Sequence, residues 1–138
     1  MREILFRGKA VNLHNGSKDF VYGQYVQNRD GKMIYSDTWE NGIQKHYVIE
    51  ETVGQYTGLT DKNGKKIFEG DILEITSEYY NRKEKSLYKV KYHEATASWC
   101  AFAIDFIQRV PLCKNECKYY KVIGNIHDNP ELLKGGVE

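Results

Sequence analysis

Three cysteines and four histidines are the residues in this 138-residue sequence most suited to metal chemistry. Cys113 and Cys117 form a Cys-x-x-x-Cys pair, and Cys100 together with His93 or His127 would complete four zinc ligands. Structural zinc usually takes two close ligand pairs, whereas here the second pair would come from distant segments. We therefore expect no metal and no other cofactor. Cys100 should be a small core residue, and the other two cysteines should lie in a polar loop.

Two carboxylates, Glu69 and Asp71, are a second candidate for chemistry because they flank Gly70. Carboxylates so close together can act as general acid and base or hold a divalent cation. An aspartate after a glycine more often caps a turn by accepting backbone N–H groups. The sequence also has no nucleophile motif around its histidines and no glycine-rich phosphate loop. We expect a structural role for the pair, no catalytic residue, and a protein that is not an enzyme.

Basic residues gather at two predicted turns, with aromatic residues near them. This combination can bind single-stranded nucleic acid through phosphate contacts and base stacking. The candidate contacts are Lys62, Lys65, Lys66, Tyr79, Tyr80, Arg82, Lys83, Lys85 and Trp99. However, the net charge is only +1 and neither half of the chain is basic, and lysines at turns often protect strand edges. Nucleic-acid binding is therefore the alternative hypothesis.

Short β-strands are expected to position all of these candidates. Asn-Gly or Asp-Gly pairs begin at Asn15, Asp30, Asn41 and Asn63, and both dipeptides favour hairpin turns. The first half predicts antiparallel strands at residues 3–11, 19–27, 32–39 and 43–50. The second half predicts strands at residues 56–60, 65–68, 71–80, 86–94, 98–107 and 118–126, with a charged loop between the third and fourth. Residues 98–107 are so apolar that we expect a central strand covered on both faces.

Several residues are expected to shape turns rather than carry function. They are Asp61, Asn63, Gly64, Gly70, Asp71, Asn129 and Pro130. The first three suit a type I turn followed by a left-handed glycine, with the aspartate side chain as its cap. The next two suit a sharp corner between strands, of the kind that small barrels need. The last two suit the N-cap and first position of a short C-terminal helical turn.

Four segments that cover both ends and the middle of the chain carry a further pattern. They are MREILFRGK from Met1, FVYGQYV from Phe20, ETVGQYTGLTDKNGKKIFEGDILEI from Glu51 and VIGNIHDNPELL from Val122. Together they resemble the YopX family of small proteins encoded by phages and prophages. The resemblance implies a mainly β protein, with an antiparallel β segment at residues 1–53. An SH3-like small β-barrel or roll should follow at residues 54–138 and end in a short helical turn. The resemblance implies no catalytic residue, cofactor or activity.

Taken together, these features favour a non-enzymatic protein-interaction module. The sequence contains eleven tyrosines, and exposed sheet edges with aromatic residues suit strand addition or peptide docking. The expected partner is an unidentified phage or host protein, and pairing with a second copy is a further option. The N-terminus is too charged for a signal peptide, and no apolar run reaches membrane-spanning length. We expect a location in the cytoplasm of the bacterial host.

Overall fold

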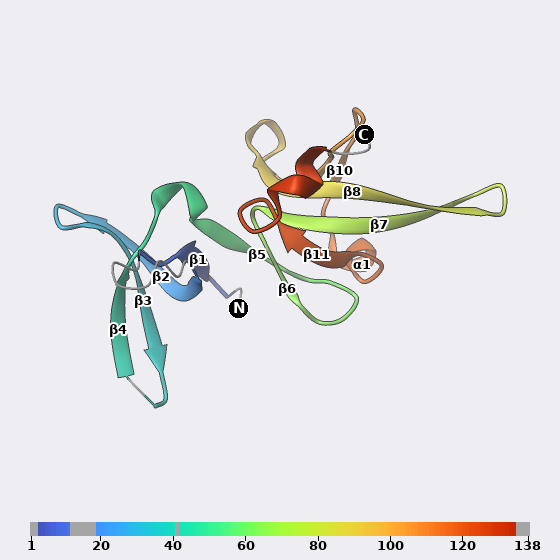
Figure 1. Cartoon of the computed structure of the whole chain (residues 1–138). Helices are drawn as coiled ribbons and strands as arrows, with labels where there is room; N and C mark the ends of the chain where they lie inside the picture. The colour runs from blue at the N-terminus through green and yellow to red at the C-terminus, as the bar shows by residue number, and fades with distance from the viewer. Residues whose placement is uncertain (1–2, 12–18, 41, 135–138) are drawn as a thin grey trace. The chain divides into compact units, whose positions relative to one another are not determined.

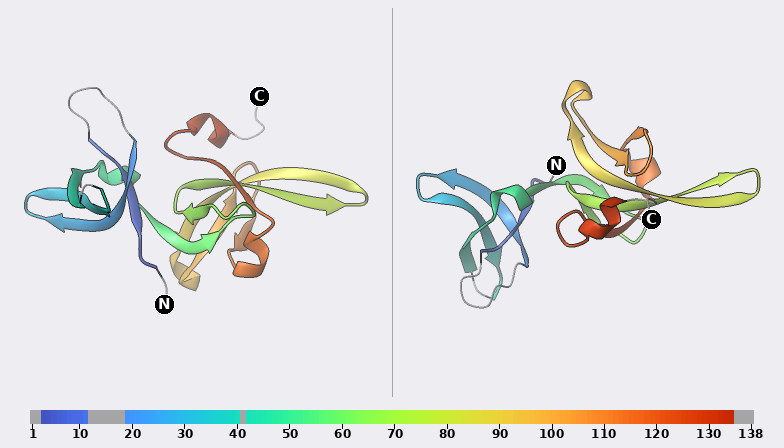
Figure 2. Two further views of the ribbon diagram at one scale, coloured as in Figure 1. Left: turned by 90° about the horizontal axis from the view of Figure 1, so that it is seen from below. Right: turned by 45° about the horizontal axis from the view of Figure 1, so that its top comes forward.

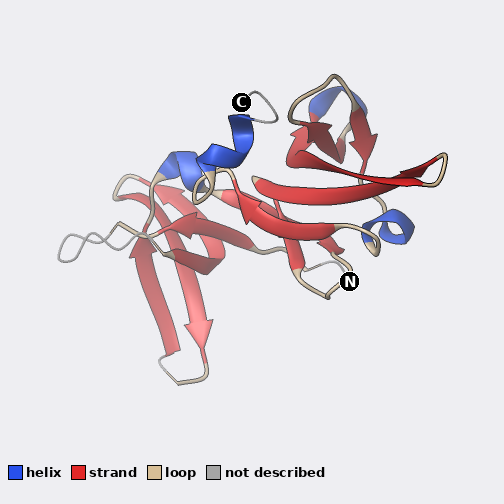
Figure 3. Cartoon of the chain, turned by 45° about the vertical axis from the view of Figure 1, so that its right-hand side comes forward, coloured by secondary structure: helices blue, strands red, loops and turns tan. Residues whose placement is uncertain are grey.

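The computed structural model describes residues 3–11, 19–40 and 42–134, and most of them lie in β-strands (Figures 1 and 3). The chain forms two compact units, Met1–Tyr56 and Thr57–Glu138. The sequence places this boundary after Val53, directly before strand β5 (Gly54–Thr60). In the structure, β5 runs across the boundary and therefore belongs to both units.

The first unit is an antiparallel meander. Its strands are β1 (Phe6–Lys9), β2 (Phe20–Asn28), β3 (Gly31–Thr38), β4 (Gly42–Tyr47) and the start of β5, and the 3-10 helix η1 (Glu50–Thr52) precedes β5. The hydrogen-bonded strand order is β4-β3-β2-β1-β5-β6, in which the last strand, β6 (Lys66–Phe68), belongs to the second unit. The turn predicted at Asp30 joins β2 to β3, and the Asp30 N–H donates to Asn28 Oδ1 at 2.8 Å. The turn predicted at Asn15 and the residue Asn41 lie outside the described residues.

Cations are packed into the first unit beside its apolar core. Arg7 and Lys9 on β1 are 4% and 8% exposed. The Arg7 guanidinium carbon and Lys9 Nζ lie 4.3 and 4.2 Å from the centroid of the Phe20 ring. An aromatic face attracts cations electrostatically, so this ring offsets part of the cost of burying the two charges.

The second unit is built on a five-stranded antiparallel sheet. Its elements after β5 are β6 (Lys66–Phe68), β7 (Asp71–Tyr79), β8 (Arg82–His93), η2 (Glu94–Thr96), β9 (Ser98–Ala103), β10 (Arg109–Pro111), α1 (Lys114–Cys117), β11 (Lys121–Asn125) and the 3-10 helix η3 (Pro130–Lys134). The strand order is β10-β9-β8-β7-β11. Pro130 begins η3, and the side chain of the preceding Asn129 accepts the Asn125 N–H at 3.2 Å.

The described strands of the second unit do not close into a barrel. The five-stranded sheet ends at β10 and β11, which are not paired with each other, and β5 and β6 pair in the other sheet. The β5–β6 hairpin contacts β11 through the Asp61 side chain, which accepts the Val122 N–H, instead of through a strand ladder. The described strands therefore confirm the expected mainly β, antiparallel structure, and no closed barrel is found among them.

Strand β9 is shorter than predicted, and it is an interior strand between β8 and β10 but not the middle strand of the sheet. It ends at Ala103, and the next residues leave the sheet with Phe106 43% and Ile107 104% exposed. The central strand is β8, between β7 and β9. The apolar run at residues 98–107 therefore combines a half-buried strand with an exposed loop, which hydrophobicity alone cannot separate.

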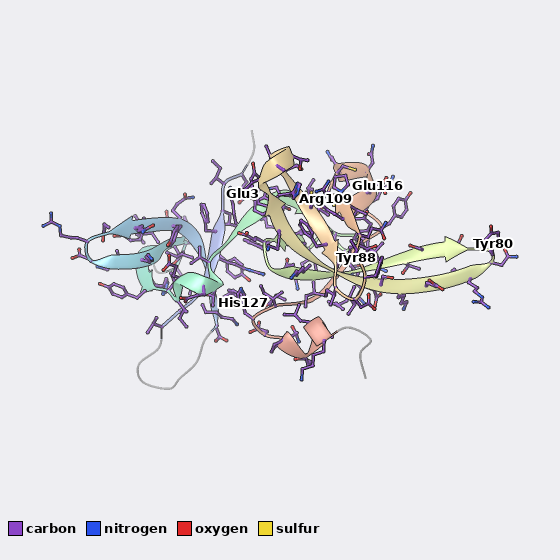
Figure 4. All side chains as sticks on the ribbon, turned by 90° about the horizontal axis from the view of Figure 1, so that it is seen from above. Glu3, Tyr80, Tyr88, Arg109, Glu116 and His127 are labelled. Carbon is purple, nitrogen blue, oxygen red and sulfur yellow. The ribbon has the colours of Figure 1, made fainter. Side chains whose placement is uncertain are left out.

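A long hairpin extends from the second unit. Tyr80 and Asn81 join β7 to β8, and their φ values of 49° and 67° fit a two-residue type I′ turn. Figures 1 and 2 show the hairpin end extending away from the rest of the unit, and Figure 4 labels Tyr80 at its tip. The segment that begins at Arg82 belongs to β8, so the prediction of a charged loop there is wrong. We call this hairpin end the β7–β8 arm (residues 76–85).

Candidate binding groove between β5 and α1

A pocket of about 370 Å³ opens in the second unit between the end of β5 and helix α1. One wall is formed by residues 58–61, and the other by Lys114, Asn115 and Lys118. We call this pocket the β5–α1 groove. Its volume is within the range of about 300–1,000 Å³ that is common for binding pockets in proteins.

The β5 wall is a strand edge that is only partly paired. On the edge that faces β1, pairing ends with the Tyr56 N–H, which donates to the Leu5 carbonyl at 2.8 Å. The other neighbour of β5 is β6, on the opposite edge. Among the described residues, the backbone from Gly58 to Thr60 therefore has no strand partner on its β1-side edge. Gly58 has a φ of +88° and carries no Cβ, so a ligand can approach the backbone closely here.

Asp61 fixes the end of this wall. Its Oδ1 accepts the N–H groups of Asn63 and Lys65 at 2.8 and 2.9 Å, which is the turn cap that the sequence predicts. Its Oδ2 accepts the Val122 N–H at 2.9 Å and so connects the turn to β11. Burial by itself raises the pKa of Asp61, but these three bonds stabilise the carboxylate and leave its pKa below the usual value. The carboxylate is therefore charged at neutral pH, and both of its oxygens accept hydrogen bonds that stabilise the fold.

Helix α1 is held in place by its last residue. Cys117 is 1% exposed and belongs to the apolar core of the unit, together with Tyr120. Burial, with a smaller effect of the nearby Cys113, raises the pKa of the Cys117 thiol to about 11. The thiol therefore stays protonated and unreactive at neutral pH. The predicted polar loop is correct for the exposed Cys113 but wrong for Cys117, because one helical turn directs Cys117 into the core.

Two lysines give the α1 wall a positive charge. Lys114 and Lys118 are four residues apart, a spacing that places side chains on the same side of a helical turn. Both are exposed, and neither forms an ion pair within the part of the chain that the structure describes. The Lys62 N–H donates to the Tyr120 carbonyl at 2.9 Å, so a third lysine stands beside the segment that follows α1. Lys114 and Lys118 were not among the predicted contacts, because the sequence does not predict the helical turn that places them on the same side.

The lysines predicted for nucleic-acid contact belong to two separate places. Lys62, Lys65 and Lys66 lie on or beside the β5–β6 turn, whereas Arg82, Lys83 and Lys85 lie on the β7–β8 arm. Figure 1 shows the turn and the arm tip well apart. On the arm, Lys83 is opposite Glu78, and Lys85 Nζ lies 3.9 Å from Glu74 Oε1. Lys83 and Lys85 thus each face a carboxylate, whereas Arg82 is opposite Tyr79, so the arm is not uniformly basic.

The predicted aromatic contacts are also dispersed. Tyr79 ends β7, and Tyr80 at the arm tip is 90% exposed. Trp99 lies on β9 opposite Tyr92, with the two ring centroids 5.2 Å apart. Tyr92 and Arg82 are ten residues apart on β8, which corresponds to about 33 Å along a strand. Trp99 therefore does not stack beside the cations of the arm.

The carboxylate pair Glu69 and Asp71 lies outside the groove. Asp71 is 1% exposed, and its Oδ2 accepts the Phe68 N–H at 2.8 Å across the β6–β7 turn. Gly70 in this turn has a φ of +92°, and its N–H donates to the Val90 carbonyl at 2.9 Å. Asp71 thus holds a sharp corner, which is the structural role that the sequence predicts.

The proposed zinc ligands are likewise not assembled. Cys100 is buried on β9, whereas His93 at the end of β8 contacts Thr96 and Arg109. Within residues 3–11, 19–40 and 42–134, no three His, Cys, Asp or Glu side chains form a group that could hold a metal ion. No helix of this described part is both long enough and apolar enough to cross a membrane.

Comparisons with known proteins place the chain in a family. The fold is similar to the crystal structure of protein EF1440 from Enterococcus faecalis, with a TM-score of 0.62 and 24% sequence identity. The similarity covers 96% of this chain and 99% of that chain. No curated protein matches the sequence. The family model described as YopX protein matches residues 8–134, which is nearly the whole length, and the chain therefore belongs to the YopX family.

Proposed function

We propose that this chain is a non-enzymatic protein-binding module and that the β5–α1 groove is its binding surface. The observation that carries the proposal is the open backbone edge at Gly58 to Thr60, which lies beside two lysines that have no ion-pair partner among the described residues. Extended peptides bind such edges by adding a strand, and side chains next to the edge select the sequence. The groove offers both features, an open backbone edge and charged side chains next to it, in one pocket.

The groups most able to do chemistry in the second unit serve its structure instead. The buried carboxylates of Asp61 and Asp71 accept backbone N–H groups, and the Cys117 thiol has a pKa of about 11. A catalytic acid, base or nucleophile must instead reach its substrate and have a pKa that suits its role. These observations support binding over catalysis.

The family resemblance supplies the biological setting of the proposal. It supports an SH3-like second unit in a protein encoded by a phage or prophage. The binding partner would then be a phage or host protein in the bacterial cytoplasm, and a second copy of the chain is an alternative partner. Nucleic acid is the second candidate ligand, supported by Lys62, Lys114 and Lys118 near the groove and disfavoured by the carboxylates that face Lys83 and Lys85 on the arm.

Site-specific photocrosslinking tests the proposal. A photoreactive amino acid at Asn115, which lines the groove, should give a discrete adduct with one protein in cells that carry the phage or prophage. The matched control is the same amino acid at the exposed Glu78 on the β7–β8 arm, which should give no such adduct. Equal adducts at both positions, or none at Asn115, would refute the groove as the binding surface.

A further inference from the structure

We infer that the β5–α1 groove accepts an extended acidic segment of the partner protein. This inference rests on the proposed function and deepens it by naming the chemistry of the ligand. It depends on three properties of the groove: its charge, its backbone edge and its size.

The charge of the groove favours carboxylate side chains. Lys114 and Lys118 line it, and neither ammonium group is neutralised by a carboxylate among the described residues. The carboxylate of Asp61 also lies in the lining, but both of its oxygens accept backbone N–H groups. The charge left to act on a ligand is therefore positive, and it attracts acidic residues and repels basic ones.

The backbone edge favours an extended ligand. Between Tyr56, the last residue bonded to β1, and Asp61, which turns toward β6, the β1-side edge of β5 has no strand partner among the described residues. A short extended peptide can therefore form main-chain hydrogen bonds at Gly58 and Thr60, whereas the Leu59 N–H already donates to Thr57 Oγ1 at 3.2 Å. In a peptide bound in this way, alternate side chains point to the same face, so acidic residues at every second position can point toward the α1 lysines.

The size of the groove favours a peptide over a nucleic acid. A volume of about 370 Å³ suits a few side chains of one segment. Nucleic acid is normally bound along a cationic stripe with aromatic stacking partners. The candidate aromatics Tyr80 and Trp99 lie on other elements, at the arm tip and on β9. The exposed Tyr119, whose ring centroid lies 5.3 Å from Lys118 Nζ, gives one stacking face beside the groove. One ring can stack on one base and does not form the row of aromatic faces that a nucleic-acid strand normally uses.

Fluorescence anisotropy with a defined probe tests the inference. The probe is a fluorescein-labelled decapeptide that alternates glutamate and threonine, measured against peptides with glutamine or lysine in place of glutamate. We expect the acidic probe to bind the full chain at low salt and the other two to bind at least about tenfold more weakly. Binding of the glutamine peptide with equal affinity would overturn the role of charge.

Charge-reversal variants locate the site. The double variant Lys114→Glu, Lys118→Glu should weaken acidic-probe binding by at least about tenfold. The double variant Lys83→Glu, Lys85→Glu on the β7–β8 arm changes the net charge equally and should alter affinity less than about twofold. Because Lys114 and Lys118 are exposed and form no ion pair with the residues that the structure describes, the groove variant should keep the wild-type circular dichroism spectrum. The milder variant Lys114→Gln, Lys118→Gln provides the same test if the first fails to fold.

The outcomes separate this inference from the proposed function. Absence of acidic-probe binding, an equal loss in both double variants, or tighter binding of a 20-nucleotide oligothymidylate would each overturn the acidic-peptide inference. If the photocrosslink at Asn115 still yields a discrete protein adduct, the protein-binding function stands and only the ligand chemistry is wrong. If that crosslink is also absent, both proposals fail.

Discussion

Replacing Asp61 by alanine should destabilise the second unit more than any other single loss of a turn side chain discussed above. The substitution leaves the buried Val122 N–H without its acceptor, which typically costs about 1–3 kcal/mol. It also removes the cap that accepts the Asn63 and Lys65 N–H groups, and caps of this kind contribute about 0.5–2 kcal/mol. The two effects together predict a loss of about 3 kcal/mol in the free energy of unfolding.

Urea denaturation followed by tryptophan fluorescence can measure this loss for the second structural unit separately from the first. The chain has two tryptophans, and Trp39 in the first unit is 101% exposed. In a Trp39→Phe background the half-buried Trp99 on β9 reports on the second unit alone. With an m-value of about 1.5 kcal/mol per M, Asp61→Ala should lower the midpoint by about 2 M urea. The control Asp105→Ala, at an exposed position of the same unit, should change the free energy by less than about 0.5 kcal/mol.

The contribution of Asp61 should also depend on pH. Its folded pKa lies below its ordinary value of 3.8, so the carboxylate stabilises the unit above that pH. The stabilisation is lost as the pH falls from 3.8 through the lower folded pKa. The stability difference between wild type and Asp61→Asn should therefore be constant near neutral pH and shrink below about pH 4. A midpoint for Asp61→Ala within error of the control, or a difference that grows in acid, would refute this account of Asp61.

Three further predictions concern the corner after β6 and the cysteines. Asp71→Asn should reduce the stability of the second unit by about 0.5–2 kcal/mol in the same assay, since it weakens the acceptor of the Phe68 N–H; unchanged stability would contradict the corner role. Gly70→Ala should cost at least about 1 kcal/mol, because its φ is +92° while its added Cβ would meet only ordinary contacts. A thiol reagent at pH 8 should modify Cys113 rapidly and Cys117 only on unfolding, as burial raises the Cys117 pKa to about 11. A Cys113→Ser variant that keeps the fast phase would show that this assignment is incorrect.

Local turn chemistry explains which parts of the fold the sequence predicts. Asp30-Gly31 and the Asp61 to Gly64 turn carry residues whose side chains and φ preferences encode the reversal. The Tyr80-Asn81 turn was missed, because tyrosine rarely adopts positive φ and here does so in a two-residue hairpin. In that case the strand pairing of β7 with β8 imposes the turn.

Tertiary contacts decide the parts that the sequence does not predict. The segment at Lys114 gives no helical pattern over its few residues, and the helix is stabilised by the burial of Cys117 in the core. The candidate site depends on the same burial of Cys117. This burial brings Lys114 and Lys118 close to residues 58–61, which lie more than fifty positions earlier in the chain. The predicted cluster of lysines and aromatics was wrong for the corresponding reason: its members, spread over residues 62–99, lie on different elements that tertiary contacts do not bring together.

The most direct test of the central claim is an amide NMR titration of the full chain with the glutamate–threonine decapeptide. The account predicts that the largest shift changes occur at Gly58, Leu59 and Thr60 and at the amides of Lys114 and Lys118, which form the two walls of the groove. Amides of the β7–β8 arm should not move. Shift changes centred on the arm, or spread evenly over the surface, would contradict the claim that the β5–α1 groove is the binding site.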